Sequence, residues 1–211
     1  MRKRGTILKH LNFLPGRLIL REGTRADYAA LERFHYIAGR PATFAAIWTI
    51  HHQQLDELLG QLQSHPIAIA ILSYPCLNSS ARELALNLHH LSRKRSQNFV
   101  NQNIRTISRI IIHPTYRGLG LARILIQSIL KNPPTRFTEA LATMAKAHPL
   151  FKKSGMQEFP SFGDDKPTYY LFDRDPSRGT GASPESLPGK TDGGSTSRPH
   201  SGQMVGEPRR S

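Results

Sequence analysis

The residue pattern best suited to chemistry lies between residues 110 and 125, where an apolar run meets a turn and two closely spaced glycines. It reads Ile-Ile-Ile-His-Pro-Thr-Tyr-Arg-Gly-Leu-Gly-Leu-Ala-Arg-Ile-Leu. Glycine lets a backbone approach a ligand where a Cβ would clash, and the helix expected to follow begins with unpaired N–H groups and a positive dipole end. The pattern therefore predicts a phosphate-binding loop, with Arg117 as a cation at its mouth.

Two common nucleotide-binding motifs are absent. The chain has no Gly-x-x-x-x-Gly-Lys-Ser/Thr sequence, which excludes a Walker loop, and only one Gly-x-Gly occurs in this region, which excludes the dinucleotide fingerprint. An ordinary tight turn between a strand and a helix remains the alternative to a phosphate site.

The loop resembles the Arg/Gln-x-x-Gly-x-Gly/Ala loop of GNAT-type N-acetyltransferases, here Arg117-Gly-Leu-Gly-Leu-Ala122. Two further segments, 21–28 and 147–156, resemble the opening strand and helix and the Ala-x-x-Leu-Tyr-x-x-x-Gly-Phe helix of that family. The resemblance covers much of residues 17–172 and is dense over 104–156. The sequence around residues 34–36, 39–41 and 151–156 also resembles that of acetyltransferase domains fused to ABC-type ATPases, although this chain carries no ATPase.

The resemblance implies an enzyme that moves an acetyl group from acetyl-CoA directly to an amine, with no metal. It also implies the residues that hold acetyl-CoA. The strand backbone of Ile110, Ile111 and Ile112 would bind pantetheine, and the amides of Arg117, Gly118, Leu119, Gly120, Leu121 and Ala122 would bind pyrophosphate. The sequence departs from the family at Phe151, where a tyrosine often protonates the departing thiolate. A catalytically weak module that binds CoA and docks on nucleic acid or protein therefore stays open, and the acceptor amine is not identified.

Three residues are candidates for the proton transfers that an amine acceptor requires. Glu139 is the first choice for the base, because it lies on the strand after the loop helix, which lines the acetyl-CoA split in the family. His148 is placed near the thioester, and Tyr36, together with His35, ends the first helix at the acceptor side. Their alternatives are a surface carboxylate, a histidine facing water and a packed tyrosine.

The elements that must position these residues follow from hydrophobic periodicity. Strands are expected at 17–23, 66–74, 104–113, 137–144 and 168–172. Helices are expected from Thr24, over 44–62 as a continuous or broken helix ending near Gly60, and over 79–98, 121–131 and 145–153. Thr24 followed by Asp27 is a variant capping box for the first helix. This order predicts an α/β fold, and the resemblance implies a central mixed, mostly antiparallel sheet flanked by helices.

Composition divides the chain into three parts: a basic N-terminal extension over 1–14, a domain over 15–173, and a tail over 174–211. The tail is almost devoid of apolar side chains and is expected to be disordered. The net charge is +14, and the tail, with six Lys/Arg and four Asp/Glu, accounts for little of it. The basic clusters at 2–4 and 93–95 predict a surface for nucleic acid or another polyanion, with a solvated surface as the alternative.

The remaining residues exclude several classes of protein. The single cysteine, Cys76, cannot form a disulfide within the chain. The adjacent histidine pairs at 51–52 and 89–90 lack metal-ligand spacing, so no metal is expected. No apolar run is long enough to span a bilayer and no signal segment is recognisable, which favours a cytoplasmic protein without a membrane partner.

Overall fold

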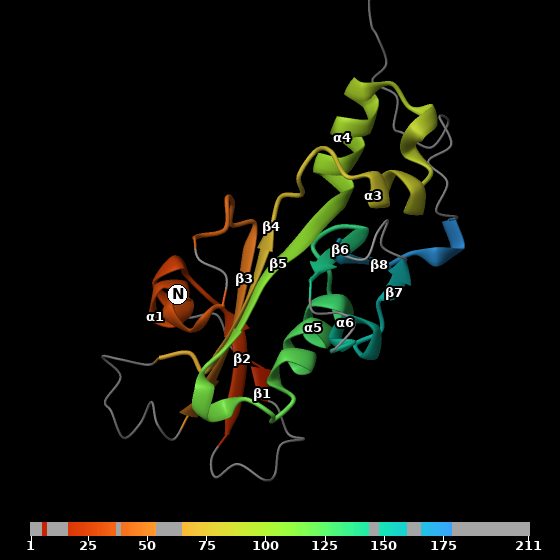
Figure 1. Ribbon diagram of the computed structural model, residues 1–211. Helices are drawn as coiled ribbons and strands as arrows, with labels where there is room; N and C mark the ends of the chain where they lie inside the picture. The colour runs from red at the N-terminus through yellow and green to blue at the C-terminus, as the bar shows by residue number, and fades with distance from the viewer. Residues whose placement is uncertain are drawn as a thin grey trace, which may run out of the picture.

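The computed structural model describes residues 6–7, 17–36, 39–53, 65–143, 148–159 and 166–178. Its centre is one eight-stranded sheet in the order β1-β2-β3-β4-β5-β6-β8-β7 (Figure 1). All neighbouring strands are antiparallel except β5 and β6, which are parallel. The strands are β1 (Thr6–Ile7), β2 (Leu18–Glu22), β3 (Ala46–His52), β4 (Ala68–Ser73), β5 (Ile104–Ile112), β6 (Phe137–Ala142), β7 (Gln157–Phe159) and β8 (Thr168–Asp173). The predicted mixed, mostly antiparallel sheet is confirmed.

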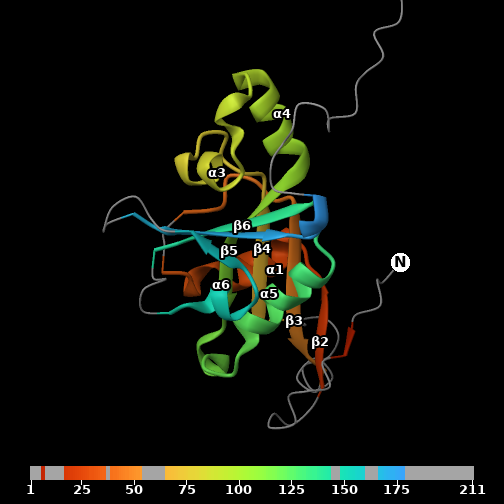
Figure 2. The same ribbon diagram turned by 90° about the vertical axis from the view of Figure 1, so that its right-hand side faces the viewer.

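Helices cover both faces of the sheet. Their bounds are α1 (Arg25–Leu31), η1 (Glu32–Phe34), α3 (Ser80–Ala85), η3 (Leu88–His90), α4 (Arg93–Asn103), η4 (Pro114–Tyr116), α5 (Leu121–Lys131), α6 (Leu150–Lys153) and η5 (Pro176–Arg178). Helix α1 packs on one face with Ile69 and Ile71 of β4, and α5 packs on the other with Ala68 and Ala70. Figures 1 and 2 show these two layers on opposite sides of the strands. Because β4 is covered on both faces, its whole length is apolar and buried.

Local sequence signals place two helix starts. Thr24 caps α1 as expected: its hydroxyl accepts from the Asp27 amide at 3.3 Å, and its amide donates to the Asp27 carboxylate at 2.7 Å. Helix α5 begins after Gly120 and spans the predicted residues 121–131. Its inner face buries Leu125 and Ile129 against the sheet. The N-terminus of α5 is therefore fixed directly after the two loop glycines.

The helix expected over residues 44–62 is wrong over its first part. Residues Ala46–His52 form β3, which pairs with β2 on one side and β4 on the other. The segment Ala-Ile-Trp-Thr-Ile-His-His is rich in β-branched and aromatic residues, and its last four residues are buried. Tertiary pairing decides the conformation here, and residues 54–62 lie outside the described part of the chain.

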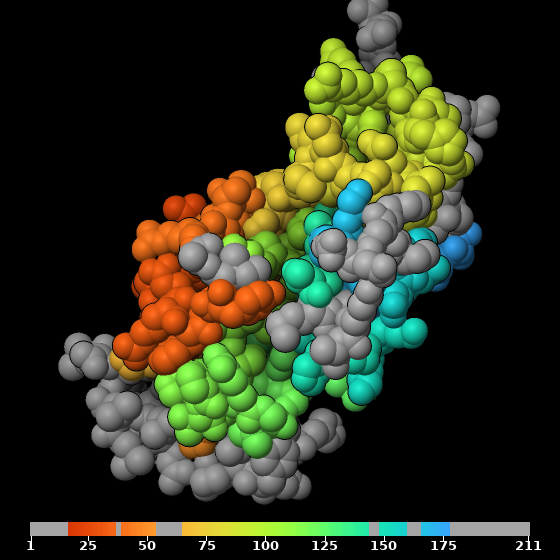
Figure 3. Space-filling view, viewed as in Figure 1, coloured from red at the N-terminus to blue at the C-terminus, as the bar shows by residue number. Residues whose placement is uncertain are grey.

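The helix expected over residues 79–98 is broken in two. Asn87 has a φ of 52°, in the left-handed region, and this separates α3 from the segment of η3 and α4. Residues 80–103, which we call the α3–α4 lobe, project from one end of the sheet (Figures 1 and 3). A second core, formed by Leu86, Phe99, Ile104 and Phe137 among others, joins the lobe to β5, β6 and β8.

Two described elements, β1 and η5, lie outside the expected domain over 15–173. Strand β1 lies within the expected N-terminal extension and pairs with β2, so these residues continue the sheet. At the other end, η5 follows β8 within the expected tail, and Arg136 donates to the Asp175 carbonyl oxygen at 3.3 Å. The described structure thus extends to residue 178, whereas residues 179–211 lie outside it.

Candidate active site

The sheet opens between its two parallel strands. Only Ile104, Arg105 and Thr106 of β5 pair with β6, opposite Phe137, Thr138 and Glu139. Beyond Thr106, β5 pairs only with β4, and beyond Glu139, β6 pairs only with β8. The edge of β5 that carries the predicted pantetheine residues 110–112 therefore presents backbone N–H and C=O groups without a strand partner.

A β-bulge lies where the strands separate. Ile71 of β4 is opposite Arg109, whereas Leu72 is opposite Ile107, so Ser108 is an extra residue in β5. A bulge bends a strand and increases its twist. The hydroxyls of Ser108 and Ser73 lie 2.6 Å apart across the distortion. The bulge thus coincides with the point at which β5 leaves β6.

The glycine loop follows β5 directly and has the expected backbone conformation. Gly118 and Gly120 have φ values of 81° and 76°, which non-glycine residues rarely adopt. A Cβ built on either residue meets no protein atom within 4 Å, so both face open space. Because Gly120 is the N-cap of α5, the first-turn amides of Leu121 and Ala122 have no acceptor within the helix. These amides lie at the start of a helix, where an anion would find hydrogen-bond donors.

The Arg117 side chain faces the protein as well as the loop. Its Nη2 donates to the Phe34 carbonyl oxygen at 3.1 Å and its Nε to the Ile112 carbonyl oxygen at 3.3 Å. The Phe34 ring also lies 4.8 Å from the His113 ring, edge to face. The Arg117 side chain therefore connects the end of β5 with η1 through hydrogen bonds. The expected contact with a phosphate would add to this positioning role.

A pocket of about 230 Å³ opens at the split between β5 and β6. Its lining brings together four elements that are far apart in sequence: the end of η1, β5, the end of β6 and α6. The lining residues are His35, Tyr36, Ile107, Ser108, Arg109, Ile110, Leu141, Ala142, Thr143, His148, Leu150 and Phe151. Two of the three predicted catalytic residues, Tyr36 and His148, thus share one pocket with Ile110.

Glu139 lies elsewhere. It is 1% exposed, and four hydrogen bonds occupy its carboxylate. Arg82 of α3 donates to both oxygens at 2.7 Å, Thr106 donates at 2.6 Å and Tyr169 at 2.9 Å. Glu139 does not line the pocket at the split. Its side chain instead connects the sheet to the α3–α4 lobe.

The electrostatics of this buried network agree with its geometry. Burial alone would lower the pKa of the Arg82 guanidinium, but the hydrogen bonds and charge of Glu139 raise that pKa above its ordinary value. Burial, followed by the Glu139 charge, raises the pKa of the Tyr169 hydroxyl. Arg82 also donates to the Cys76 carbonyl oxygen at 2.7 Å. The network contains a buried ion pair, Arg82 with Glu139, whose hydrogen bonds compensate for the loss of hydration of the two charges.

Phe151 lines the pocket but has no proton to give. Its ring centroid lies 5.5 Å from that of Tyr170, a residue buried beneath the pocket, and burial raises the pKa of the Tyr170 hydroxyl. The described lining groups that can exchange a proton with a substrate are His35, Tyr36 and His148. Tyr36 is 69% exposed and stands at the open side of the site.

Sequence reasoning did not identify Arg82, Ser108 or Arg109. Nothing distinguishes Arg82 from a surface arginine in the polar stretch that contains it, and its partner is 57 residues away. A bulge at Ser108 depends on the register with β4, which strand periodicity alone does not reveal. The one available signal was Arg109 itself, a charge in the middle of an otherwise apolar strand end.

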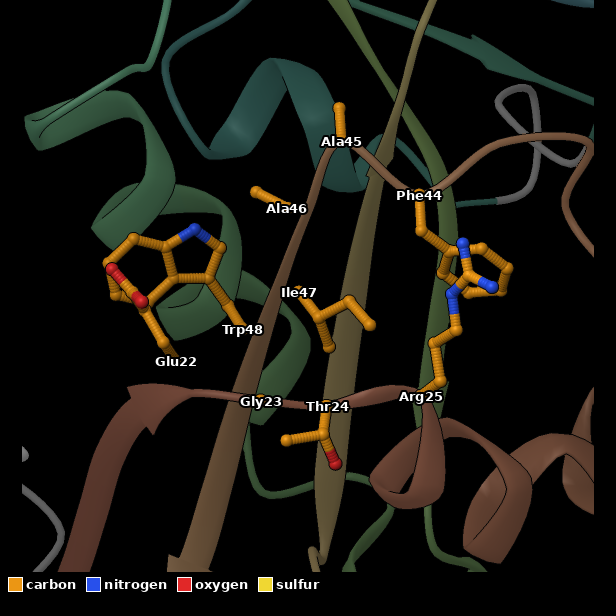
Figure 4. A pocket seen from close by; sticks show the side chains of 9 residues that line it. All are labelled: Glu22, Gly23, Thr24, Arg25, Phe44, Ala45, Ala46, Ile47 and Trp48. Carbon is orange, nitrogen blue, oxygen red and sulfur yellow. The ribbon is translucent and has the colours of Figure 1, made fainter. Parts of the chain in front are cut away.

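A second pocket, of about 460 Å³, lies where β2 ends and β3 begins. Figure 4 shows Glu22 beside Trp48 on one side of β3, and Arg25 beside Phe44 on the other. The Arg25 guanidinium carbon lies 5.1 Å from the centre of the Phe44 ring. The charged side chains of Glu22 and Arg25 lie on opposite sides of β3 and do not face one another. This pocket is therefore not the candidate site.

Other predicted features are placed on the structure as follows. Arg93, Lys94 and Arg95 are all exposed at the start of α4. The described residues include no group of three or more side chains able to hold a metal ion. Within the same residues, no helix has the length and apolarity that crossing a bilayer requires.

Comparison with protein families found no matching family model, and no curated protein matches the chain. Among solved structures, the chain is similar to Arabidopsis thaliana NAA60 in complex with acetyl-CoA, with a TM-score of 0.50 and 15% identity over 74% of this chain and 99% of that one. A variant of the Vibrio cholerae spermidine N-acetyltransferase SpeG matches at 0.48 and 14% identity, over 75% and 94%. An agmatine N-acetyltransferase matches at 0.43 and 9%, over 74% and 99%. The likeness to the Arabidopsis structure shows that this chain has the fold of the GNAT-type N-acetyltransferases.

Proposed function

We propose that the protein transfers the acetyl group of acetyl-CoA to an amine at the split between β5 and β6. The observation that carries this proposal is the continuity of two features along one segment. The unpaired edge of β5 leads directly into a loop whose glycines, Gly118 and Gly120, both have positive φ and face open space. An extended molecule with amide groups at one end and phosphates at the other fits this arrangement.

Each part of acetyl-CoA has a matching part of the site. The pantetheine amides pair with those backbone groups of Ile110, Ile111 and Ile112 that lie on the β5 edge facing the split, in the manner of an added strand. The pyrophosphate accepts from the amides of the loop and from the first turn of α5. The thioester then lies in the pocket, between β5 and the end of β6.

The reaction is a direct transfer. The amine nitrogen attacks the thioester carbonyl carbon, a C–N bond forms, and the C–S bond breaks to release CoA as a thiolate. The amine gives up one proton and the thiolate takes one. We assign these transfers to groups that line the pocket, His148 and Tyr36 with His35, because Phe151 cannot exchange a proton and Glu139 lies outside the pocket.

The test uses the full chain in two measurements. Isothermal titration with acetyl-CoA measures binding, and release of free CoA thiol in the presence of pooled amines measures turnover. Binding together with amine-dependent thiol release supports the enzyme. Absence of acetyl-CoA binding by the folded protein contradicts the proposal.

A second candidate function is a CoA-binding module that docks on a polyanion. Two observations favour it: Phe151 stands where the family often has its acid, and Arg93, Lys94 and Arg95 are exposed on the projecting α3–α4 lobe. Helix α4 contains no acidic residue. Tight binding of acetyl-CoA without turnover of any amine, together with salt-dependent binding of RNA, is the result that this candidate predicts.

The narrower resemblance to acetyltransferase domains fused to ABC-type ATPases also bears on the pocket. The segments that carry it include Tyr36 and Phe151, and both residues line the site. We keep this relationship as part of the proposal. It concerns the acceptor side of the site.

A further inference from the structure

The pocket at the split has an unusual charge for a site that must receive an amine. Among its described lining residues, the polar ones are His35, Tyr36, Ser108, Arg109, Thr143 and His148, and none is Asp or Glu. Glu139 of the neighbouring strand β6 is buried and paired with Arg82. The described lining therefore offers a protonated amine no negative partner.

Arg109 supplies a fixed positive charge to this pocket. Side chains alternate along a strand, so Arg109 shares a face of β5 with Ile111, which packs beneath α1. This is the face on which His35 and Tyr36 approach the split. Arg109 thus lies on the side of the sheet from which the acceptor would meet the thioester.

The Arg109 guanidinium lacks a counter-ion within the described residues. Two other arginines of low exposure pair with carboxylates, Arg82 with Glu139 and Arg136 with Asp173 at 2.9 Å, whereas the partly buried Arg105 lies 4.3 Å from the centre of the Tyr74 ring. Arg109 instead makes one hydrogen bond, from Nη1 to the Ser108 carbonyl oxygen at 2.8 Å, and its buried Nε has no partner. The buried Nε–H group has lost its hydrogen bond to water without gaining a protein acceptor, and a bound anion would supply that acceptor.

We propose that the acceptor is an amine that carries a carboxylate or phosphate close to its reacting nitrogen, and that Arg109 binds this anionic group. The inference rests on the proposed acetyl transfer and names its substrate class. A planar guanidinium binds carboxylate and phosphate through two parallel hydrogen bonds, which fixes the orientation of the acceptor. The same positive charge lowers the pKa of a nearby ammonium and so favours the neutral amine that attacks the thioester. Acceptors with several positive charges are repelled.

The test compares matched acceptors with the full chain. One pair is alanine and alaninamide, a second is glucosamine 6-phosphate and glucosamine, and spermidine represents cationic acceptors. Values of kcat/KM are corrected for the fraction of free amine at the assay pH. One anionic member should exceed its neutral partner by about 10- to 100-fold, the range of a charge-assisted pair of hydrogen bonds. The pair that responds distinguishes a carboxylate from a phosphate acceptor.

Two variants connect the preference to Arg109. Arg109→Gln should abolish the preference while acetyl-CoA affinity stays unchanged, and Arg109→Lys should keep part of it because the charge remains. Arg174→Gln, which removes an exposed arginine directly after β8, is the matched control and should keep the full preference. An unchanged preference in folded Arg109→Gln would overturn the role of Arg109.

A binding measurement covers the case in which no compound is turned over. The protein saturated with CoA is titrated with each member of the two pairs. If neither anionic member binds more tightly than its neutral partner, or if spermidine is the best acceptor, the inference fails while the proposed acetyl transfer stands. Failure of the chain to bind acetyl-CoA at all would instead contradict the proposed function.

Discussion

The buried carboxylate of Glu139 allows a sharp test between a structural and a catalytic role. In Glu139→Gln, one of the two oxygens that accept from Arg82 becomes an NH₂ group, which faces a guanidinium that can only donate. The hydrogen bonds from Thr106 and Tyr169 lose the negative charge that strengthens them. Arg82, whose side chain is 2% exposed, is left as an uncompensated buried charge.

The expected loss of stability follows from this geometry. Removing one partner of a buried, hydrogen-bonded ion pair destabilises a protein by about 3–5 kcal/mol. With a denaturant slope of about 2 kcal/mol per molar urea, the midpoint of urea unfolding should fall by about 2 M. The matched control is Glu83→Gln, which removes an exposed carboxylate from α3, the helix that also carries Arg82. This variant should change the free energy of unfolding by less than about 0.5 kcal/mol.

A double variant isolates the pair. Arg82→Met combined with Glu139→Gln removes the stranded cation, so its loss of stability should be smaller than the sum of the two single losses. Residual turnover in the folded fraction of Glu139→Gln should stay within a few-fold of the parent. The opposite pattern, parental stability with acetyl transfer slowed by about 100-fold, is the signature of a general base and would refute the structural role.

Three further predictions concern the loop, alkaline pH and the α3–α4 lobe. Gly120→Val should abolish measurable acetyl-CoA binding in isothermal titration, because the added side chain enters the open space proposed for phosphate and strains a φ of 76°. The control variant Leu119→Ala keeps the backbone amide of residue 119 and should bind acetyl-CoA nearly as the parent does. Burial and the Glu139 charge raise the pKa of Tyr169, so the native state keeps a proton that the unfolded chain releases above about pH 10. The free energy of unfolding should therefore fall more steeply above that pH in the parent than in Tyr169→Phe, as measured by denaturant unfolding at several pH values. Replacing Arg93, Lys94 and Arg95 by Ala should weaken RNA binding and flatten its salt dependence in filter-binding assays, and an intact chain that binds no RNA at moderate salt would contradict the polyanion surface.

Local sequence determined the features that depend on neighbouring residues. The capping box of Thr24 and Asp27 begins α1, and the spacing of Gly118 and Gly120 before an amphipathic run fixes both the loop conformation and the start of α5. These signals act within one helical turn or one tight turn, where side-chain chemistry and allowed φ values decide the backbone. The conformation of the glycine loop and the start of α5 were therefore predictable from the residues themselves.

Only the tertiary structure decided the features that depend on distant partners. Residues Ala46–His52 are a strand because β2 and β4 lie on either side of them, which no periodicity within the segment reveals. Glu139 is buried because Arg82, 57 residues earlier, supplies the charge that makes burial tolerable. Arg109 lines the pocket because the bulge at Ser108 and the separation of β5 from β6 are set by pairing across the sheet. A carboxylate or a guanidinium has the same appearance in sequence whether it binds substrate or holds the fold together, since its environment alone determines which of the two it does.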